Sequence, residues 1–176
     1  MSMKWLVAVI LVCGGLWAYH HASAPTPMTW TPARVRELTS ALRDADGQRA
    51  PTQTLSSAKR ILVYFSASWC PPCRAFTPEL VTYYNTHNGG KAFQLLFVSN
   101  DQSAEDMLAY MKDDSMPWWG VPFHSSLSKS LIKAYEGPGI PCLVMLDGTG
   151  HVLADSWAGD RYLGPHAVLS ALDAEQ

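Results

Sequence analysis

The stretch that decides the fold is ILVYFSASWCPPC, residues 61–73. Ile61 to Phe65 form an apolar run of the β type, and a helical pattern begins at the cysteines. A Cys-x-x-Cys pair at such a junction puts its first thiol at a helix N-terminus, where free N–H groups and the helix dipole favour the thiolate. Pro71 and Pro72 suit the first helical turn, which needs no N–H donors. Because thiolates attack disulfides, the pattern predicts thiol–disulfide chemistry at Cys70 and Cys73.

Two other roles are open to a Cys-x-x-Cys pair. A structural zinc site needs two more ligands at matching spacing. The chain has no second Cys-x-x-Cys and no two histidines separated by three to five residues, and beyond the motif it offers Cys13, Cys142 and the scattered His87, His124, His151 and His166. A purely structural disulfide at this spacing closes a loop too short to restrain the unfolded chain much. We therefore expect a redox pair and no metal.

The composition indicates one packed domain. The chain has 176 residues, of which 48% are hydrophobic and 16% charged, which supports a core and argues against disorder. The net charge of −2 argues against nucleic-acid binding. A monomer without an organic cofactor is expected.

The first 24 residues have the pattern of a secretory signal peptide. Lys4 is their only charged residue, an apolar stretch follows from Trp5 to Leu16, and residues 22–24 are Ala-Ser-Ala. We expect export with cleavage after Ala24, which makes the protein periplasmic or otherwise extracytoplasmic. The alternative is an uncleaved segment that anchors the protein in a membrane. Cys13 follows Val12, which is too large for a lipoprotein cleavage site, so it is interpreted as one more apolar signal residue.

Beyond the signal segment, strand and helix patterns alternate. Thr31-Pro32 starts a helix that Asp46-Gly47 ends, residues 53–55 suggest a short edge strand, and the helix with the cysteines runs to about Tyr84. The remaining expected elements are a buried parallel strand 93–98, a helix 105–112 capped by Ser103, an aromatic loop 116–123, a helix from Ser126 or Ser128 to Tyr135, a strand 142–146, a hairpin turn 147–150 with return strand 151–154, and a last helix after Gly164-Pro165. This order predicts an α/β sheet with helices on both faces.

The same order resembles the thioredoxin fold, and within it the tryparedoxin and nucleoredoxin group. Four separated segments of the chain between residues 50 and 155 carry the resemblance: YFSASWCPPCRAFTP at 64–78, FVSND at 97–101, MPW at 116–118 with VPF at 121–123, and Ile140-Pro141 before a strand. It implies a central mixed sheet flanked by helices over residues 51–176, preceded by a short helical extension, residues 25–50. The signal segment favours an exported, bacterial-type member.

The resemblance also implies residue roles. Cys70 is the attacking nucleophile, Cys73 is the resolving thiol, and the two form the redox-active disulfide. Pro141 is expected to be cis and to face the pair, with its neighbouring backbone pairing with an extended substrate chain. Trp69, Pro71, Pro72 and Ile140 complete the expected active-site surface. The implied partners are disulfide-containing proteins and a membrane-bound or soluble thiol electron donor.

One departure concerns Tyr64, which stands where thioredoxins proper carry an acidic residue. A carboxylate there helps to take the proton from the resolving thiol, whereas a tyrosine does not near neutral pH. We interpret Tyr64 as a packing residue with a bonded hydroxyl.

Several points stay open at the level of sequence. The pair is expected to reduce protein disulfides, and the alternatives are an oxidase or isomerase that forms them and a non-catalytic interaction module. Cys142 is expected to be a buried free thiol, with a third redox cysteine as the alternative. Trp69 is expected both to pack and to wall the active site, and Trp118 and Trp119 either receive a partner or cover the sheet edge.

Overall fold

The computed structural model describes residues 28–87 and 89–175. The expected signal segment, residues 1–24, therefore lies outside the described part of the chain. Within that part, no helix is long and apolar enough to cross a membrane.

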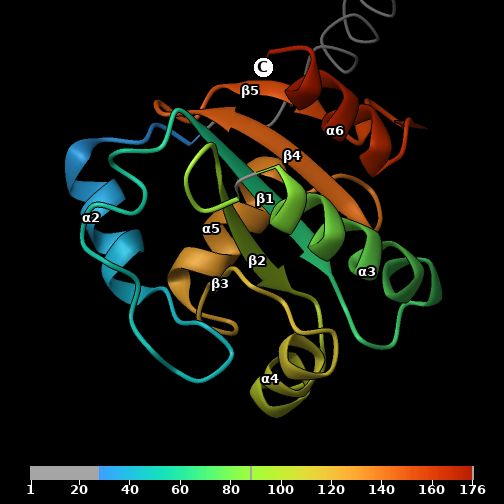
Figure 1. Ribbon diagram of the computed structural model, residues 1–176, viewed down its shortest axis with the longest axis horizontal. Helices are drawn as coiled ribbons and strands as arrows, with labels where there is room; N and C mark the ends of the chain where they lie inside the picture. The colour runs from blue at the N-terminus through green and yellow to red at the C-terminus, as the bar shows by residue number, and fades with distance from the viewer. Residues whose placement is uncertain (1–27, 88, 176) are drawn as a thin grey trace, which may run out of the picture.

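A five-stranded mixed sheet forms the centre of the molecule, with strand order β3-β2-β1-β4-β5 (Figure 1). Strands β1, β2 and β3 run parallel, and β4 and β5 are antiparallel to their neighbours. The elements follow one another as α2 (Pro32–Ala41), β1 (Arg60–Ser66), α3 (Pro71–Thr86), β2 (Gln94–Ser99), α4 (Ala104–Asp113), β3 (Trp119–Gly120), α5 (Ser126–Tyr135), β4 (Cys142–Asp147), β5 (Val152–Asp155), β6 (Trp157–Ala158), β7 (Arg161–Tyr162) and α6 (Pro165–Asp173).

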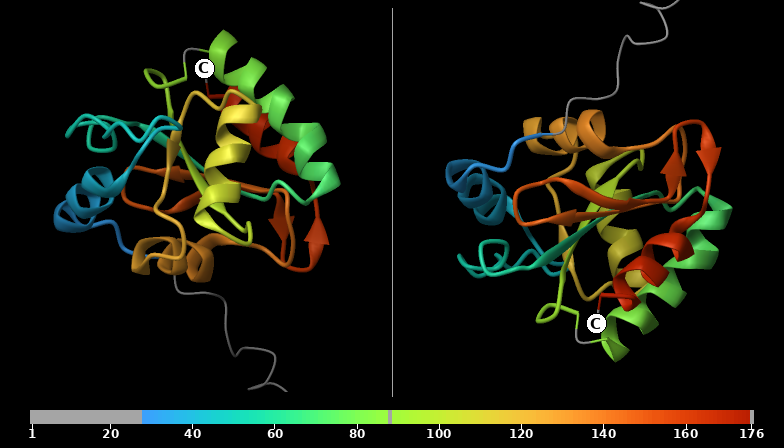
Figure 2. Two further views of the ribbon diagram at one scale, coloured as in Figure 1. Left: turned by 90° about the horizontal axis from the view of Figure 1, so that it is seen from below. Right: turned by 90° about the horizontal axis from the view of Figure 1, so that it is seen from above.

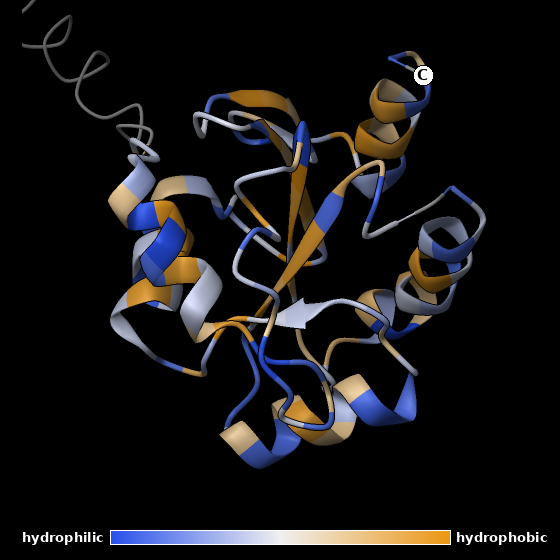
Figure 3. Ribbon diagram, turned by 60° about the vertical axis from the view of Figure 1, so that its left-hand side comes forward, coloured by the Kyte–Doolittle hydropathy of each residue, from blue (hydrophilic) through white to orange (hydrophobic). Residues whose placement is uncertain are grey.

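The helices cover both faces of this sheet, as the sequence predicts. Helices α3, α4 and α6 lie on one side of the sheet and α5 lies on the other, with α2 packed into the same core as α5 (Figure 2). Alternate residues of a strand point to opposite faces. Accordingly Leu62 and Tyr64 pack under α3, whereas Ile61, Val63 and Phe65 pack toward α2 and α5. The central strands β1, β2 and β4 are apolar and buried on both faces, and the outer surfaces of the helices are more polar (Figure 3).

The N-terminal helix is an integral part of the core. Thr31 caps α2 by accepting a hydrogen bond from the N–H of Arg34, and Pro32 occupies the first turn, as expected. Leu38 and Leu42 are fully buried in the same cluster as β1, β2 and β4. The segment 25–50 therefore packs, in its described part, directly on the sheet domain.

Two expectations about the region before β1 are wrong. The helix ends at Ala41 rather than at Asp46-Gly47, because Leu42 is extended and Arg43 exchanges two backbone hydrogen bonds with Gly120 of β3. Residues 53–55 form turns and not an edge strand. The carbonyl of Gln53 accepts from the N–H of Ser57, and that of Leu55 accepts from Ala58, so local bonds replace a ladder.

Candidate active site

The two cysteines of the motif form a disulfide at the start of α3. Cys70 is the N-cap residue, and its Sγ accepts a hydrogen bond from the backbone N–H of Cys73 at 3.3 Å. Pro71 and Pro72 occupy the first two helical positions and are exposed. The structure thus holds the first sulfur against the free N–H groups of a 16-residue helix, the environment that favours a thiolate.

The two sulfurs differ in their surroundings. Cys70 is 4% exposed and lies beside exposed residues, whereas Cys73 is completely buried one turn deeper. Trp69 is 56% exposed, so it is part of the active-site surface and not, as the sequence interpretation also had it, a packing residue. Its indole Nε1 donates to the carbonyl of Asn100 at 3.0 Å, which holds the ring beside the disulfide.

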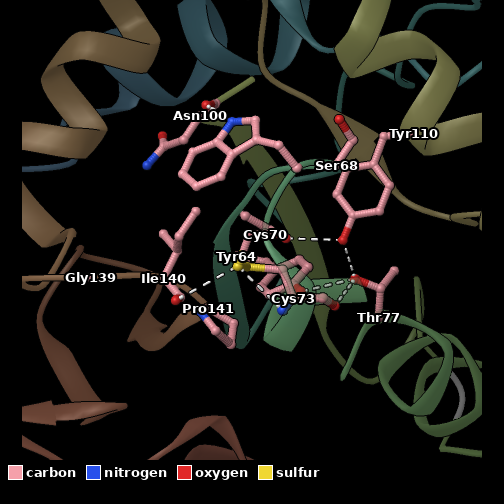
Figure 4. Close-up of a disulfide and its surroundings, with 12 residues drawn as sticks. Tyr64, Ser68, Cys70, Cys73, Thr77, Asn100, Tyr110, Gly139, Ile140 and Pro141 are labelled. Carbon is pink, nitrogen blue, oxygen red and sulfur yellow. Dashed lines mark hydrogen bonds between the residues drawn. A yellow bond between two sulfur atoms is a disulfide. The ribbon is translucent and has the colours of Figure 1, made fainter. Parts of the chain in front are cut away.

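The loop before β4 faces the disulfide, as Figure 4 shows for Gly139, Ile140 and Pro141. The Ile140–Pro141 peptide bond is cis, in agreement with the expectation. The carbonyl oxygen of Ile140 lies 3.8 Å from Cys70 Sγ, and Pro141 is buried. The structure therefore brings together the cysteine pair and the proline loop, which are 70 residues apart in the chain.

A buried carboxylate anchors the loop that leads into the motif. Asp101 Oδ1 accepts from both the N–H and the hydroxyl of Ser68 at 2.7 Å, and Oδ2 accepts from the Ser99 hydroxyl at 2.7 Å. Asp101 is 4% exposed. In the sequence, Asp101 belongs to the segment FVSND that carries the family resemblance, and no role was predicted for it. Its position just after β2 could have predicted the contact, because β1 and β2 run parallel and their ends meet at one edge of the sheet.

Hydroxyl groups line the space behind Cys73 (Figure 4). The Thr77 hydroxyl donates its single proton to the carbonyl of Cys73. Thr77 Oγ1 therefore accepts from the hydroxyls of Tyr64 and Tyr110, at 2.9 and 2.6 Å. Burial raises the pKa of Tyr64 well above its ordinary value, which keeps the phenol neutral. The interpretation of Tyr64 as a packing residue with a bonded hydroxyl is confirmed.

Cys142 is a buried free thiol, as expected. It packs with Phe65 and Val144 on the sheet face that α2 and α5 cover, in a different cluster from Cys70 and Cys73. Burial raises the pKa of Cys142 to about 12. Both properties argue against a third redox cysteine.

The aromatic loop does not offer an exposed docking pair. Trp118 is 1% exposed and packs edge-on against Tyr84, with ring centroids 5.6 Å apart. Trp119 is half-buried against the core and belongs to the edge strand β3. These tryptophans cover the sheet, which decides between the two roles left open by the sequence.

Comparison with known proteins agrees with this geometry. A family model described as "Thioredoxin-like" matches residues 58–152. Nucleoredoxin of Homo sapiens is 39% identical over 127 residues, which are 70% of this chain and 28% of that protein. Probable nucleoredoxin 1 of Arabidopsis thaliana is 45% identical over 96 residues, which are 54% of this chain and 16% of that protein. The chain therefore spans less than a third of either nucleoredoxin.

A solved structure extends the likeness to the whole fold. Tryparedoxin I from Leishmania major superposes with a TM-score of 0.64 at 34% identity, over 82% of this chain and 94% of that one. The resemblance to the tryparedoxin and nucleoredoxin group is confirmed, and so is the thioredoxin fold. Because the family model covers more than half of its residues, the chain belongs to the thioredoxin-like family.

Proposed function

We propose that this protein is a thiol–disulfide oxidoreductase that reduces disulfide bonds of protein substrates. One observation carries the proposal: Cys70 and Cys73 form a disulfide in which Cys70 caps a helix and Cys73 is buried one turn away. This arrangement separates a sulfur that is poised to attack from one that is held in reserve. The nucleoredoxin and tryparedoxin relatives support the same class of chemistry.

The reaction uses the electrons of the reduced pair. The Cys70 thiolate attacks one sulfur of the substrate disulfide, an S–S bond forms to Cys70, and the other substrate sulfur leaves as a thiolate that takes up a proton. Cys73 then loses its proton and attacks Cys70 Sγ, which expels the second substrate thiol and closes the Cys70–Cys73 disulfide. Two electrons pass to the substrate. Since the two sulfurs carry both of them, the scheme uses no metal or organic cofactor.

Trapping of the mixed disulfide tests these roles. Cys73→Ser should accumulate a covalent complex with a disulfide-containing protein, because the second attack is removed, and Cys70→Ser should not. Non-reducing electrophoresis measures the complex. Equal trapping by both variants would show that the assignment of nucleophile and resolving thiol is wrong.

The direction of electron flow is set by the reduction potential. A reductase needs a stable disulfide and hence a low potential, and about 30 mV corresponds to a tenfold change in equilibrium. We expect equilibration against glutathione to place the pair clearly below about −120 mV, the value of a strong periplasmic oxidant. A potential near that value would assign disulfide formation to this protein and leave the cysteine roles unchanged.

The proposal includes export. Its support is the pattern of Lys4, the apolar stretch and Ala22-Ser23-Ala24. N-terminal sequencing of the mature protein should begin at Pro25, and a retained segment would instead make the protein membrane-anchored. Outside the cytoplasm a membrane-bound or soluble thiol donor has to restore the dithiol. Full-length chain in the soluble cytoplasm would reject export.

A further inference from the structure

The loop that faces Cys70 runs from Glu136, the residue after α5, to Pro141. Pro138 and Pro141 fix φ at their own positions, whereas Gly137 and Gly139 leave the backbone between them free to turn. Glycine leaves the backbone more conformational freedom than any other residue. Yet this loop places the Ile140 carbonyl 3.8 Å from Cys70 Sγ. Contacts from elsewhere in the fold therefore have to hold it.

Trp157 supplies the first of these contacts. Its indole Nε1 donates to the carbonyl of Gly139 at 3.1 Å. The same ring lies against Gly137, where an added Cβ would come within 2.2 Å of Trp157 Cδ1. Glycine at position 137 thus allows the ring to rest directly on the loop backbone, and the half-buried ring in turn limits where that backbone can move.

Tyr162 supplies the second contact. Its hydroxyl donates to the carbonyl of Pro141 at 3.0 Å, and its ring packs against Trp157 with centroids 4.7 Å apart. The two residues pair across the small β6–β7 sheet. The buried Ser156 joins this hairpin to β4, because its hydroxyl accepts from the N–H of Leu143 at 2.8 Å and donates to the Leu143 carbonyl at 2.9 Å.

We propose that Trp157 and Tyr162 are positioning residues, which hold the backbone of residues 139–141 in place beside Cys70 and thereby align the substrate chain with the attacking sulfur. This inference rests on the proposed function. The two side chains donate hydrogen bonds to the carbonyls of Gly139 and Pro141, on either side of Ile140. Loss of either hydrogen bond should therefore displace the backbone beside Cys70 Sγ. A misplacement of about 1 Å at a reacting centre is enough to cost about 100-fold in rate.

The test compares Tyr162→Phe, Trp157→Phe and the double variant with wild type. The matched control is Tyr83→Phe, which also loses one hydroxyl, bonded to Asp173, but lies 12 residues beyond Pro71 along α3, about 18 Å away. Steady-state reduction of a protein disulfide such as insulin, and of hydroxyethyl disulfide as a small substrate, gives kcat and KM. Alkylation of reduced Cys70 by iodoacetamide reports the intrinsic reactivity of the sulfur.

Each single variant should lower kcat/KM for insulin about three- to tenfold, the effect of one hydrogen bond, with a fall in kcat because misalignment acts on the attack itself. Reduction of the small disulfide and alkylation of Cys70 should stay within twofold of wild type, because neither needs the aligned chain. The double variant should lose less than the product of the single effects, since both side chains hold the same segment. Tyr83→Phe should have the same kcat/KM as wild type for both substrates.

If folded Tyr162→Phe reduces insulin with the same kcat/KM as the wild-type protein, the inference is overturned and the proposed function is left intact. Equal losses with both substrates would also overturn it, because they would show a general effect and not one on alignment. If Trp157→Phe fails to fold, Tyr162→Phe decides alone, since Tyr162 is 46% exposed and the substitution removes only its hydroxyl. A wild-type protein that reduces neither disulfide would reject the proposed function and this inference with it.

Discussion

Burial of Cys142 leads to a quantitative prediction about thiol reactivity. Burial raises its pKa to about 12, with smaller contributions from the carboxylates of Asp155 and Glu136. At pH 7 its thiolate fraction is therefore about 10⁻⁵, whereas an exposed cysteine with a pKa of about 8.5 is about 3% thiolate. Cys70, at a helix N-terminus, should react at least as fast as that exposed cysteine. Because a thiolate of higher pKa is the stronger nucleophile, part of this difference is offset, and alkylation of Cys142 should be slower than that of Cys70 by a factor of about 100 or more.

The assay is timed alkylation of the fully reduced protein with iodoacetamide at pH 7, followed by mass spectrometry of the peptides that carry each cysteine. Cys73 should also label more slowly than Cys70, because it is completely buried. Protein unfolded in guanidinium is the control, in which the cysteines should label at similar rates. Cys142→Ala should leave the labelling rate of Cys70 unchanged.

Labelling of Cys142 within tenfold of Cys70 in the folded protein would refute this reasoning. It would show that the thiol beside Pro141 is accessible and acidic enough to react. The redox chemistry would then involve three cysteines, and the mixed-disulfide scheme would need revision.

Three further substitutions test individual hydrogen bonds, two beside the site and one in the turn after β4. Tyr64→Phe should lower the free energy of unfolding by about 1 kcal/mol, because it removes one neutral hydrogen bond, and should leave the turnover of insulin unchanged. A large fall in turnover at unchanged stability would give the hydroxyl a chemical role. Asp101→Ala should cost about 2–4 kcal/mol in urea unfolding, because it removes three hydrogen bonds and leaves the buried Ser99 hydroxyl without an acceptor for its proton; a loss below about 0.5 kcal/mol would contradict the anchoring role. The pKa of Asp147 is lowered from 3.8 to about 2, first by the Thr149 hydroxyl, so its stabilisation is present above pH 3.8 and lost as the pH falls through about 2. The Tm difference between wild type and Asp147→Asn should accordingly shrink from pH 5 to pH 2, and a constant difference would refute the assignment.

The amino-acid sequence by itself determined the elements whose causes are local. Apolar runs buried on both faces predicted the central strands, Thr31-Pro32 and Ser103 predicted helix starts, and the cysteine spacing predicted the redox pair. Each of these signals lies within a few residues of what it specifies. Local patterns failed at residues 53–55 and at the end of α2, where turn bonds and pairing with β3 decided the outcome.

Only the tertiary structure decided which distant groups meet the cysteines. Asp101 reaches Ser68 across 33 residues because β1 and β2 are parallel neighbours, and the Ile140 carbonyl reaches Cys70 across 70 residues because β4 lies on the other side of β1. Trp157 and Tyr162 carry no sequence signal, since their role depends on a hairpin whose strands are two residues long. Contacts of this kind follow from the order of strands in the sheet, and that order is set by packing of the whole chain and not by the preference of any one segment.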